Sequence, residues 1–151
     1  MKVALGADHG GYALKEYVKK VLAEDSVEFH DFGTFSEDSV DYPDYAQKVA
    51  EEVAAGNFER GILICGTGIG MEIAANKVPG VRAALVHDVY SAQATRQHND
   101  ANILTMGGRV IGPALAGAIV KAWLSSRFEG GRHARRLEKI RALERKYSSG
   151  E

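Results

Sequence analysis

Short apolar segments alternate with amphipathic segments along most of the chain. The apolar, β-branched segments predict strands at residues 2–7, 27–32, 61–65, 81–86 and 103–106. The amphipathic segments predict helices at residues 12–23, 43 to about 56, 71–76, 90–97, 114–124 and 132–147. In the first of these helices, Leu14, Val18 and Leu22 fall on one face, which indicates a helix that packs on a core.

Strands that alternate with helices predict a parallel sheet covered on both faces, because parallel strands need crossover connections and these are right-handed. We therefore expect one three-layer α/β/α, Rossmann-like domain over residues 1–151, with strand order 2-1-3-4-5, a basic C-terminal helix and a frayed tail at residues 148–151. Ligands bind such sheets beyond the carboxyl ends of the strands, where the strand order reverses. Here the reversal lies between the first and third strands.

A glycine-rich turn follows the third predicted strand. Cys65 ends that strand, and the sequence continues as Gly66-Thr67-Gly68-Ile69-Gly70 before the next helix. Alternating glycines leave backbone N–H groups uncovered, and the first turn of a helix carries unpaired N–H groups with a partial positive charge. The pattern predicts an anion-binding turn beside the Cys65 thiol. A helix N-terminus favours the thiolate form of a nearby cysteine, so we expect Cys65 to supply a thiolate near neutral pH.

Three common phosphate-binding motifs do not fit this turn. A P-loop needs G-x-x-x-x-G-K-[ST], which the sequence lacks, and a dinucleotide-binding turn needs a third glycine where Met71 stands. A cysteine phosphatase would place an arginine at this same position to hold the phosphate. The sequence therefore argues against nucleotide binding and against phosphotransfer through Cys65.

The alternative for Cys65 is a purely structural role, as a buried residue at the end of a core strand. A second polar motif weighs against this alternative. Asp8 and His9 follow the first strand, and the carboxyl ends of the first and third strands meet at the predicted ligand-binding edge. We therefore expect Cys65 to face a ligand.

Composition restricts the function further. The net charge of −1 gives no reason to expect nucleic acid or an anionic membrane as a partner. The single cysteine allows no internal disulfide, and the five dispersed histidines lack CxxC or HExxH spacing, so we expect no metal. The sequence begins directly with a strand and has no signal-peptide or membrane-spanning run, which favours a cytoplasmic protein.

Several motifs, in order along nearly the whole chain, are together typical of one family. They are Asp8-His9-Gly10, Asp41-Tyr42-Pro43, residues 62–70 with Ala74-Ala75-Asn76-Lys77, Tyr90-Ser91-Ala92, Arg96-Gln97-His98-Asn99-Asp100, Gly108-Arg109 and Glu129-Gly130-Gly131-Arg132-His133. No single motif suffices. The combination resembles the type B ribose-5-phosphate isomerases, within the broader ribose/galactose isomerase group.

The resemblance implies an aldose–ketose isomerase that interconverts ribose 5-phosphate and ribulose 5-phosphate in the pentose phosphate pathway, without metal or cofactor. It implies that Cys65 carries a proton between C2 and C1 through a cis-enediolate. Residues 66–70 then bind the enediolate as an anion hole, and Thr67 binds substrate or orients the thiol. Some relatives use a helix glutamate instead of the cysteine, but here Met71 occupies the place that we assign to it.

The resemblance also implies which residues open the sugar ring and which bind the substrate's hydroxyls and phosphate. His98 would open the closed sugar ring, a proton transfer to which histidine is suited. The other implied contacts are Asn99 for the sugar oxygens, Asp8 and Tyr42 for the hydroxyls near the ring, and His9, Arg109, Arg132 and Arg136 for the phosphate. Arg132 and Arg136 are four residues apart, so a helix places both on one face.

His98 precedes the fifth predicted strand, whereas Cys65 ends the third. A helix after the fourth strand runs back from the carboxyl edge, so His98 should lie at the opposite end of the sheet from Cys65. We therefore expect a homodimer, or a dimer of dimers, with shared sites. Each site would combine Cys65 of one chain with His98 of a two-fold partner.

Alternatives remain for the function and for single residues. The same machinery could serve allose or galactose 6-phosphate, or the cleft could bind sugar phosphates without catalysis, as a regulatory module. His98 could simply end a helix, Tyr42 could pack a turn, and most of the charge after Arg132 could form a solvated helix face. The pair of Cys65 and His98 favours the isomerase, because binding alone needs neither a thiol nor a proton shuttle.

Overall fold

The computed structural model describes residues 1–148 and confirms the predicted order of elements. The strands are β1 (Lys2–Ala7), β2 (Glu28–Asp31), β3 (Arg60–Cys65), β4 (Ala83–Leu85) and β5 (Ile103–Gly107). The helices are α1 (Tyr12–Glu24), α2 (Tyr42–Ala54), α3 (Ile69–Ala75), α4 (Val89–Gln97), α5 (Pro113–Ser125) and α6 (Arg132–Tyr147). Within residues 1–148, no helix has the length and hydropathy needed to cross a membrane. Of the predicted frayed tail, residues 149–151 lie outside the described residues.

All five strands are parallel, in the order β2-β1-β3-β5-β4. The predicted α/β class is therefore confirmed, but the predicted order, with the fourth strand between the third and the fifth, is wrong. β5 is buried at every position and takes the interior place, whereas β4 has only three residues, and two of them, Ala84 and Leu85, are half-buried. A short, partly exposed strand suits the edge of a sheet. The reversal between β1 and β3 is unaffected by this exchange.

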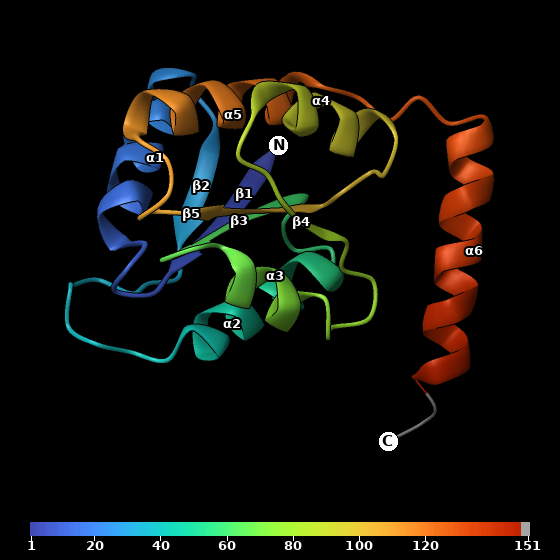
Figure 1. The fold of residues 1–151 in the computed structure, drawn as a ribbon, viewed down its shortest axis with the longest axis horizontal. Coiled ribbons are helices and arrows are strands. Elements are labelled where there is room, and N and C mark those ends of the chain that lie inside the picture. The colour runs from blue at the N-terminus through green and yellow to red at the C-terminus, as the bar shows by residue number, and fades with distance from the viewer. Residues whose placement is uncertain (149–151) are drawn as a thin grey trace.

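Helices cover both faces of the sheet, with α1, α4 and α5 on one side and α2 and α3 on the other (Figure 1). The first core lies under α1, α4 and α5 and includes Val18, Ala92, Ile119 and Trp123. The second core lies under α2 and α3 and includes Val49, Val53, Met71 and Ala75. Alternate side chains of β3 point to opposite faces, so Ile62 and Ile64 enter the first core, and Leu63 and Cys65 enter the second. Cys65 is thus directed toward the side of α2 and α3.

Helix α6 stands apart from the three layers at one side of the molecule (Figure 1). Ile140, Leu143 and Tyr147 on this helix expose 49%, 58% and 74% of their surface. The Gly80 N–H donates a hydrogen bond to Glu144 Oε1 at 3.1 Å, which ties the helix to the loop before β4. Large apolar side chains exposed along one helix indicate a surface that another chain can cover.

A buried ion pair joins α1 to β2. The Lys15 side chain is completely buried, and its Nζ donates to both carboxylate oxygens of Asp31, at 2.7 and 2.6 Å. Asp31 also accepts from Lys19 Nζ and from the Gly33 N–H, both at 2.9 Å. Burial alone would raise the pKa of Asp31, but the hydrogen bonds from Lys15, Gly33 and Lys19 outweigh burial, so the pKa is lowered. The pair therefore fixes the start of the loop that follows β2.

Replacing Lys15 by Met should destabilise the fold by about 2–4 kcal/mol, because the Asp31 carboxylate loses its buried ion-pair partner and keeps only Lys19 and the Gly33 N–H. Urea denaturation measures this loss, with Lys20→Met at an exposed position on the same helix as the control. Since the pKa of Asp31 is lowered in the folded state, its contribution to stability is present above the ordinary carboxyl pKa and disappears as the pH falls through the lowered value. Equal urea midpoints for the two variants would contradict a stabilising role for the pair.

Candidate active site

Residues from several segments converge at the carboxyl edge of the sheet. They form a cleft of about 450 Å³, lined by Asp8, Tyr42, Cys65, Gly66, Thr67, Ile69, Gly70, Ile73 and Arg109. Asp8 follows β1 and Cys65 ends β3, so the cleft lies where the strand order reverses. Every lining residue except Ile73 was a predicted site residue.

The Cys65 thiol is nearly enclosed at the end of β3. The residue is 5% exposed, and its Sγ accepts a hydrogen bond from the Gly68 N–H at 3.1 Å. An amide N–H directed at sulfur can stabilise negative charge there without any reorganisation. The cleft therefore contains a nucleophilic atom that is held against a backbone dipole.

Close packing explains why the turn after β3 is rich in glycine. Gly68 has a φ of +80°, and a Cβ atom there would lie 2.7 Å from the Met106 backbone. At Gly70, a Cβ atom would lie 2.5 Å from the Tyr42 ring, so this ring packs directly on the turn. Side chains at these two positions would displace the N–H group that points at Cys65.

Arg109 lies across the glycine turn. A Cβ atom on Gly66 would be 3.3 Å from Arg109 Nη1, and one on Gly10 would be 3.4 Å from Arg109 Cζ. The Arg109 N–H donates to the Gly66 carbonyl oxygen at 3.0 Å, which anchors the residue beside the turn. The residue is exposed, so its guanidinium adds a positive charge to the rim of the cleft.

Asp8 and His9 are oriented by their neighbours. Asp8 is 7% exposed, and its Oδ1 accepts from the Gly11 N–H at 3.1 Å. His9 Nδ1 accepts from the Val40 N–H at 3.2 Å, so Nε2 is the ring nitrogen left for another partner. His9 therefore connects the loop after β1 to the segment before α2, next to the cleft but not among the residues that line it.

The remaining predicted site residues do not join this cleft within one chain. His98 follows α4 at its C-terminal end, and Asn99 comes next, just before β5. Arg132 and Arg136 are exposed on α6. The structure thus divides the predicted residues into two groups.

The length of the sheet separates His98 from Cys65. β3 and β5 run side by side from the pair Gly61–Ile103 to the pair Cys65–Gly107. At about 3.3 Å per residue, these four steps span roughly 13 Å. Because His98 precedes the start of β5 and Cys65 marks the end of β3, the two residues lie at opposite ends of the sheet, as the connectivity predicted.

His98 contacts α6 and the loop before it. Its ring stacks on the His133 ring, with centroids 4.4 Å apart and planes inclined by 13°. Glu129 Oε1 lies 3.9 Å from His98 Nε2 and 3.7 Å from His133 Nε2. Burial lowers the pKa of His133, and the charges of Arg132 and His98 act in the same direction. The sequence spacing did not indicate this group, although its donor atoms are close enough to hold a metal ion.

Two residues near the cleft were not predicted from the sequence. Ile73 lines the cleft, and it is 57% exposed, like Ile69 at 50%. Their spacing of four residues was a usable signal, because it places them on one helix face. His87 Nε2 accepts from the Gly107 N–H at 3.0 Å, at the carboxyl end of β5. His87 comes directly after the fourth predicted strand, and this position was the sequence signal that it lies near the carboxyl edge of the sheet.

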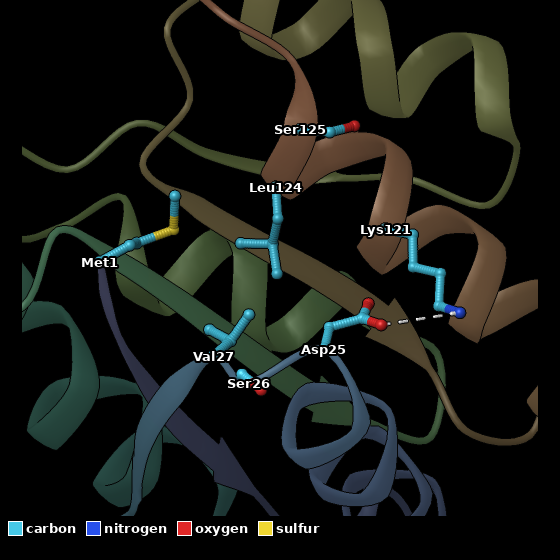
Figure 2. A pocket seen from close by; sticks show the side chains of 7 residues that line it. All are labelled: Met1, Asp25, Ser26, Val27, Lys121, Leu124 and Ser125. Carbon is cyan, nitrogen blue, oxygen red and sulfur yellow. Dashed lines mark ion pairs between the residues drawn. The ribbon is translucent and has the colours of Figure 1, made fainter.

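A second hollow, of about 420 Å³, lies beside the N-terminus of β1. Its lining residues are Met1, Asp25, Ser26, Val27, Lys121, Leu124 and Ser125. Figure 2 shows Asp25 and Lys121 as an ion pair, at 4.0 Å, next to the apolar side chains of Val27 and Leu124. None of these seven residues is a predicted site residue, so this hollow is separate from the candidate site.

Comparison with known proteins places the chain in a family. Residues 3–140 match the Ribose/Galactose Isomerase family. Ribose-5-phosphate isomerase B of Escherichia coli is 52% identical over 145 residues, which cover 96% of this chain and 97% of the relative. D-erythrulose-4-phosphate isomerase of Pectobacterium atrosepticum is 45% identical over 142 residues, 93% of each chain. The structure of Clostridium thermocellum ribose-5-phosphate isomerase B matches with a TM-score of 0.96 and 55% identity, over 98% of this chain and 100% of that one.

The chain therefore belongs to the ribose/galactose isomerase family. Within that family, its resemblance to the type B ribose-5-phosphate isomerases, inferred from the motifs, is confirmed. The protein is an isomerase.

Replacing Gly68 by Ala should slow the alkylation of Cys65 by iodoacetamide by about tenfold, because the new side chain meets the Met106 backbone and moves the N–H away from Sγ. Gly56→Ala is the matched control, since Gly56 has a φ of +81° and a Cβ atom there would meet nothing within 4 Å. Both variants place alanine at a φ near +80°, so the comparison isolates the contact that the new side chain makes at residue 68. Equal alkylation rates for the two variants would show that the Gly68 N–H does not activate the thiol.

Proposed function

We propose that the protein interconverts D-ribose 5-phosphate and D-ribulose 5-phosphate, with Cys65 as the base that moves the proton. The observation that carries this proposal is the Gly68 N–H directed at Cys65 Sγ, in a cleft that also contains Asp8 and Arg109. Membership of the ribose/galactose isomerase family supports the reaction type. The 52% identity to a relative named ribose-5-phosphate isomerase B supports the pentose phosphate as substrate.

Proton transfer begins at C2 of the open-chain aldose. Cys65 Sγ, as a thiolate, takes the proton from C2, the C–H electron pair forms the C1–C2 double bond, and the carbonyl electrons move onto O1. This gives a cis-enediolate. Sγ then returns the proton to C1, the proton of the C2 hydroxyl is transferred to O1, and C2 becomes the carbonyl carbon of the ketose. The step balances with no oxidant or reductant.

The glycine turn stabilises the charge that develops on O1. Backbone N–H groups of residues 66–70 act as the anion hole, and a single donor of this kind is worth about 3–4 kcal/mol of barrier in enzymes that use one. Thr67 Oγ1 accepts from the Ile69 N–H at 3.2 Å, which holds the turn closed beside the thiol. Asp8 and Tyr42, which also line the cleft, bind the sugar hydroxyls.

Ring opening requires a second copy of the chain. His98 is the acid and base for this step and Asn99 binds the sugar oxygens, but both residues lie at the opposite end of the sheet from Cys65. A two-fold homodimer that places the His98 end of one chain on the Cys65 end of the other creates two equal sites. The exposed apolar side chains of Ile140 and Leu143 on α6 support such an interface.

The residues that bind the phosphate also come from both chains of the dimer. Arg132 and Arg136 lie on the exposed side of α6, and their guanidinium groups suit the oxygens of a phosphate. His9 and Arg109, beside the cleft of the other chain, complete the set.

A four-carbon substrate is the second candidate, because a 45% identical relative is named D-erythrulose-4-phosphate isomerase. The two substrates differ in their need for His98. Ribose 5-phosphate closes into a furanose, whereas erythrose 4-phosphate carries its phosphate on the oxygen that would close the ring. A His98→Asn variant should therefore lose activity on the pentose and retain it on the tetrose, which makes His98 the residue that distinguishes the two candidates.

Replacing Cys65 by Ala should lower kcat/KM for ribulose 5-phosphate formation by at least about a hundredfold, because the proton on C2 loses its acceptor. Cys65→Ser is the matched variant, since it keeps a side chain of similar size but supplies a much weaker base. Exchange of solvent deuterium into ribose 5-phosphate measures the chemical step directly. If the Cys65→Ala protein exchanges deuterium at the wild-type rate, Cys65 is not the base.

Mixing a Cys65→Ala chain with a His98→Asn chain should restore activity that neither variant shows alone. Random association of equal amounts makes half of the dimers mixed, and one of the two sites in each mixed dimer is intact, so about a quarter of the wild-type activity returns. The mixture is denatured and refolded together, and ribulose 5-phosphate formation is measured. Activity no higher than the mean of the two parent variants would show that each site belongs to a single chain.

A further inference from the structure

Three side chains with metal-ligating atoms meet at the end of the molecule opposite Cys65. His98 follows α4, Glu129 lies in the loop between α5 and α6, and His133 lies in the first turn of α6. The Glu129 Oε1 atom is 3.9 Å from His98 Nε2 and 3.7 Å from His133 Nε2. One donor atom from each residue lies within 4.8 Å of the other two.

The buried ring nitrogen of His133 points to a missing partner at this place. The His133 side chain is only 8% exposed, and its Nε2 atom has no hydrogen-bond partner among the described residues. Most buried polar atoms in proteins have a partner, and one that does not is destabilising. Glu129 Oε1 lies 3.7 Å from this nitrogen, which is too far for a hydrogen bond.

The arrangement suits a divalent transition-metal ion. Two imidazole nitrogens and one carboxylate oxygen are a common set of zinc ligands, at about 2.0–2.2 Å from the ion. Donors of a tetrahedral zinc site are therefore about 3.4 Å apart, so these donors, which lie between 3.7 Å and at most 4.8 Å from one another, need to approach by roughly 0.3 to 1.4 Å. The rings stack nearly in parallel, inclined by 13°, so their Nε2 lone pairs lie in nearly parallel planes. A bound ion lies in the plane of each imidazole that holds it, so the half-exposed His98 ring has to turn out of the stack to share an ion with His133.

An ion can reach this place from solvent. The side chains of His98 and Glu129 are 39% and 52% exposed, and three protein ligands leave the fourth zinc position open. The nearby charges of Arg132 and Arg136 oppose a cation and lower its affinity. The site therefore fits an ion that binds reversibly better than a permanent structural metal.

We propose that His98, Glu129 and His133 form a site for a divalent transition-metal ion such as Zn²⁺, and that the bound ion inhibits the enzyme. The binding rests on the three side chains alone. The inhibition rests on the proposed function, because the ion occupies the His98 nitrogen that would otherwise exchange protons with the sugar ring.

Isothermal titration with Zn²⁺ tests the binding, in a Cys65→Ala background so that the thiol cannot be a ligand. One ion per chain is expected, and Glu129→Gln and His133→Gln should each weaken binding by at least about tenfold. Glu138→Gln on α6 and His30→Gln on β2 are the matched controls, and neither should change the affinity. Equal affinity in the Glu129, His133 and control variants, or no binding to the background protein, would overturn the site.

Inhibition of ribulose 5-phosphate formation tests the consequence in the protein with Cys65 intact. Zn²⁺ should inhibit, a chelator should restore the rate, and Glu129→Gln should raise the half-inhibitory concentration by at least about tenfold. Unchanged inhibition in Glu129→Gln would overturn the inhibitory role. A protein that binds Zn²⁺ as expected but forms no ribulose 5-phosphate would instead refute the proposed function and leave the metal site in place.

Discussion

The close approach of three backbone segments at the carboxyl edge of the sheet governs the rest of the site. A Cβ atom on Gly107 would lie 2.7 Å from the Thr67 backbone, and one on Gly108 would lie 2.6 Å from the Gly10 carbonyl oxygen. Only glycine allows the turns after β1, β3 and β5 to touch in this way. Because they touch, the Gly68 N–H faces Cys65 and not solvent. The geometry around the Cys65 thiol thus depends on the absence of side chains at these glycines.

Most of the fold could be predicted because its signals are local. Apolar runs and amphipathic helices gave the order of elements, and the glycine-rich turn gave the end of β3. The position of β4 could not be read in this way, because strand order depends on which strand buries both faces. The signal was present in the composition: Ile103, Leu104 and Met106 make β5 apolar at nearly every position, whereas Arg82 and His87 closely flank the short β4. Weighing length and flanking charge would have placed β4 at the edge.

The candidate site also has one part that the sequence predicts and one part that it does not. Asp8, Tyr42 and Cys65 lie near the carboxyl edge for reasons that connectivity alone supplies, and the structure brings them together. The stack of His98 on His133 depends on how α6 packs against the end of α4, and no spacing in the sequence encodes that contact. Motif reasoning located the residues in this second group individually, but it could not show which of them are neighbours.

The sheet itself explains why His98 and Cys65 lie far apart within one chain. A parallel sheet has one carboxyl edge, and every crossover helix must return to the opposite end before the next strand begins. A residue at the end of α4 therefore cannot reach Cys65 without breaking a crossover. A two-fold axis removes this restriction, because it can place the amino edge of one sheet against the carboxyl edge of the other. Helix α6, which extends from the body with Leu143 and Tyr147 exposed, carries apolar surface that the proposed homodimer would bury.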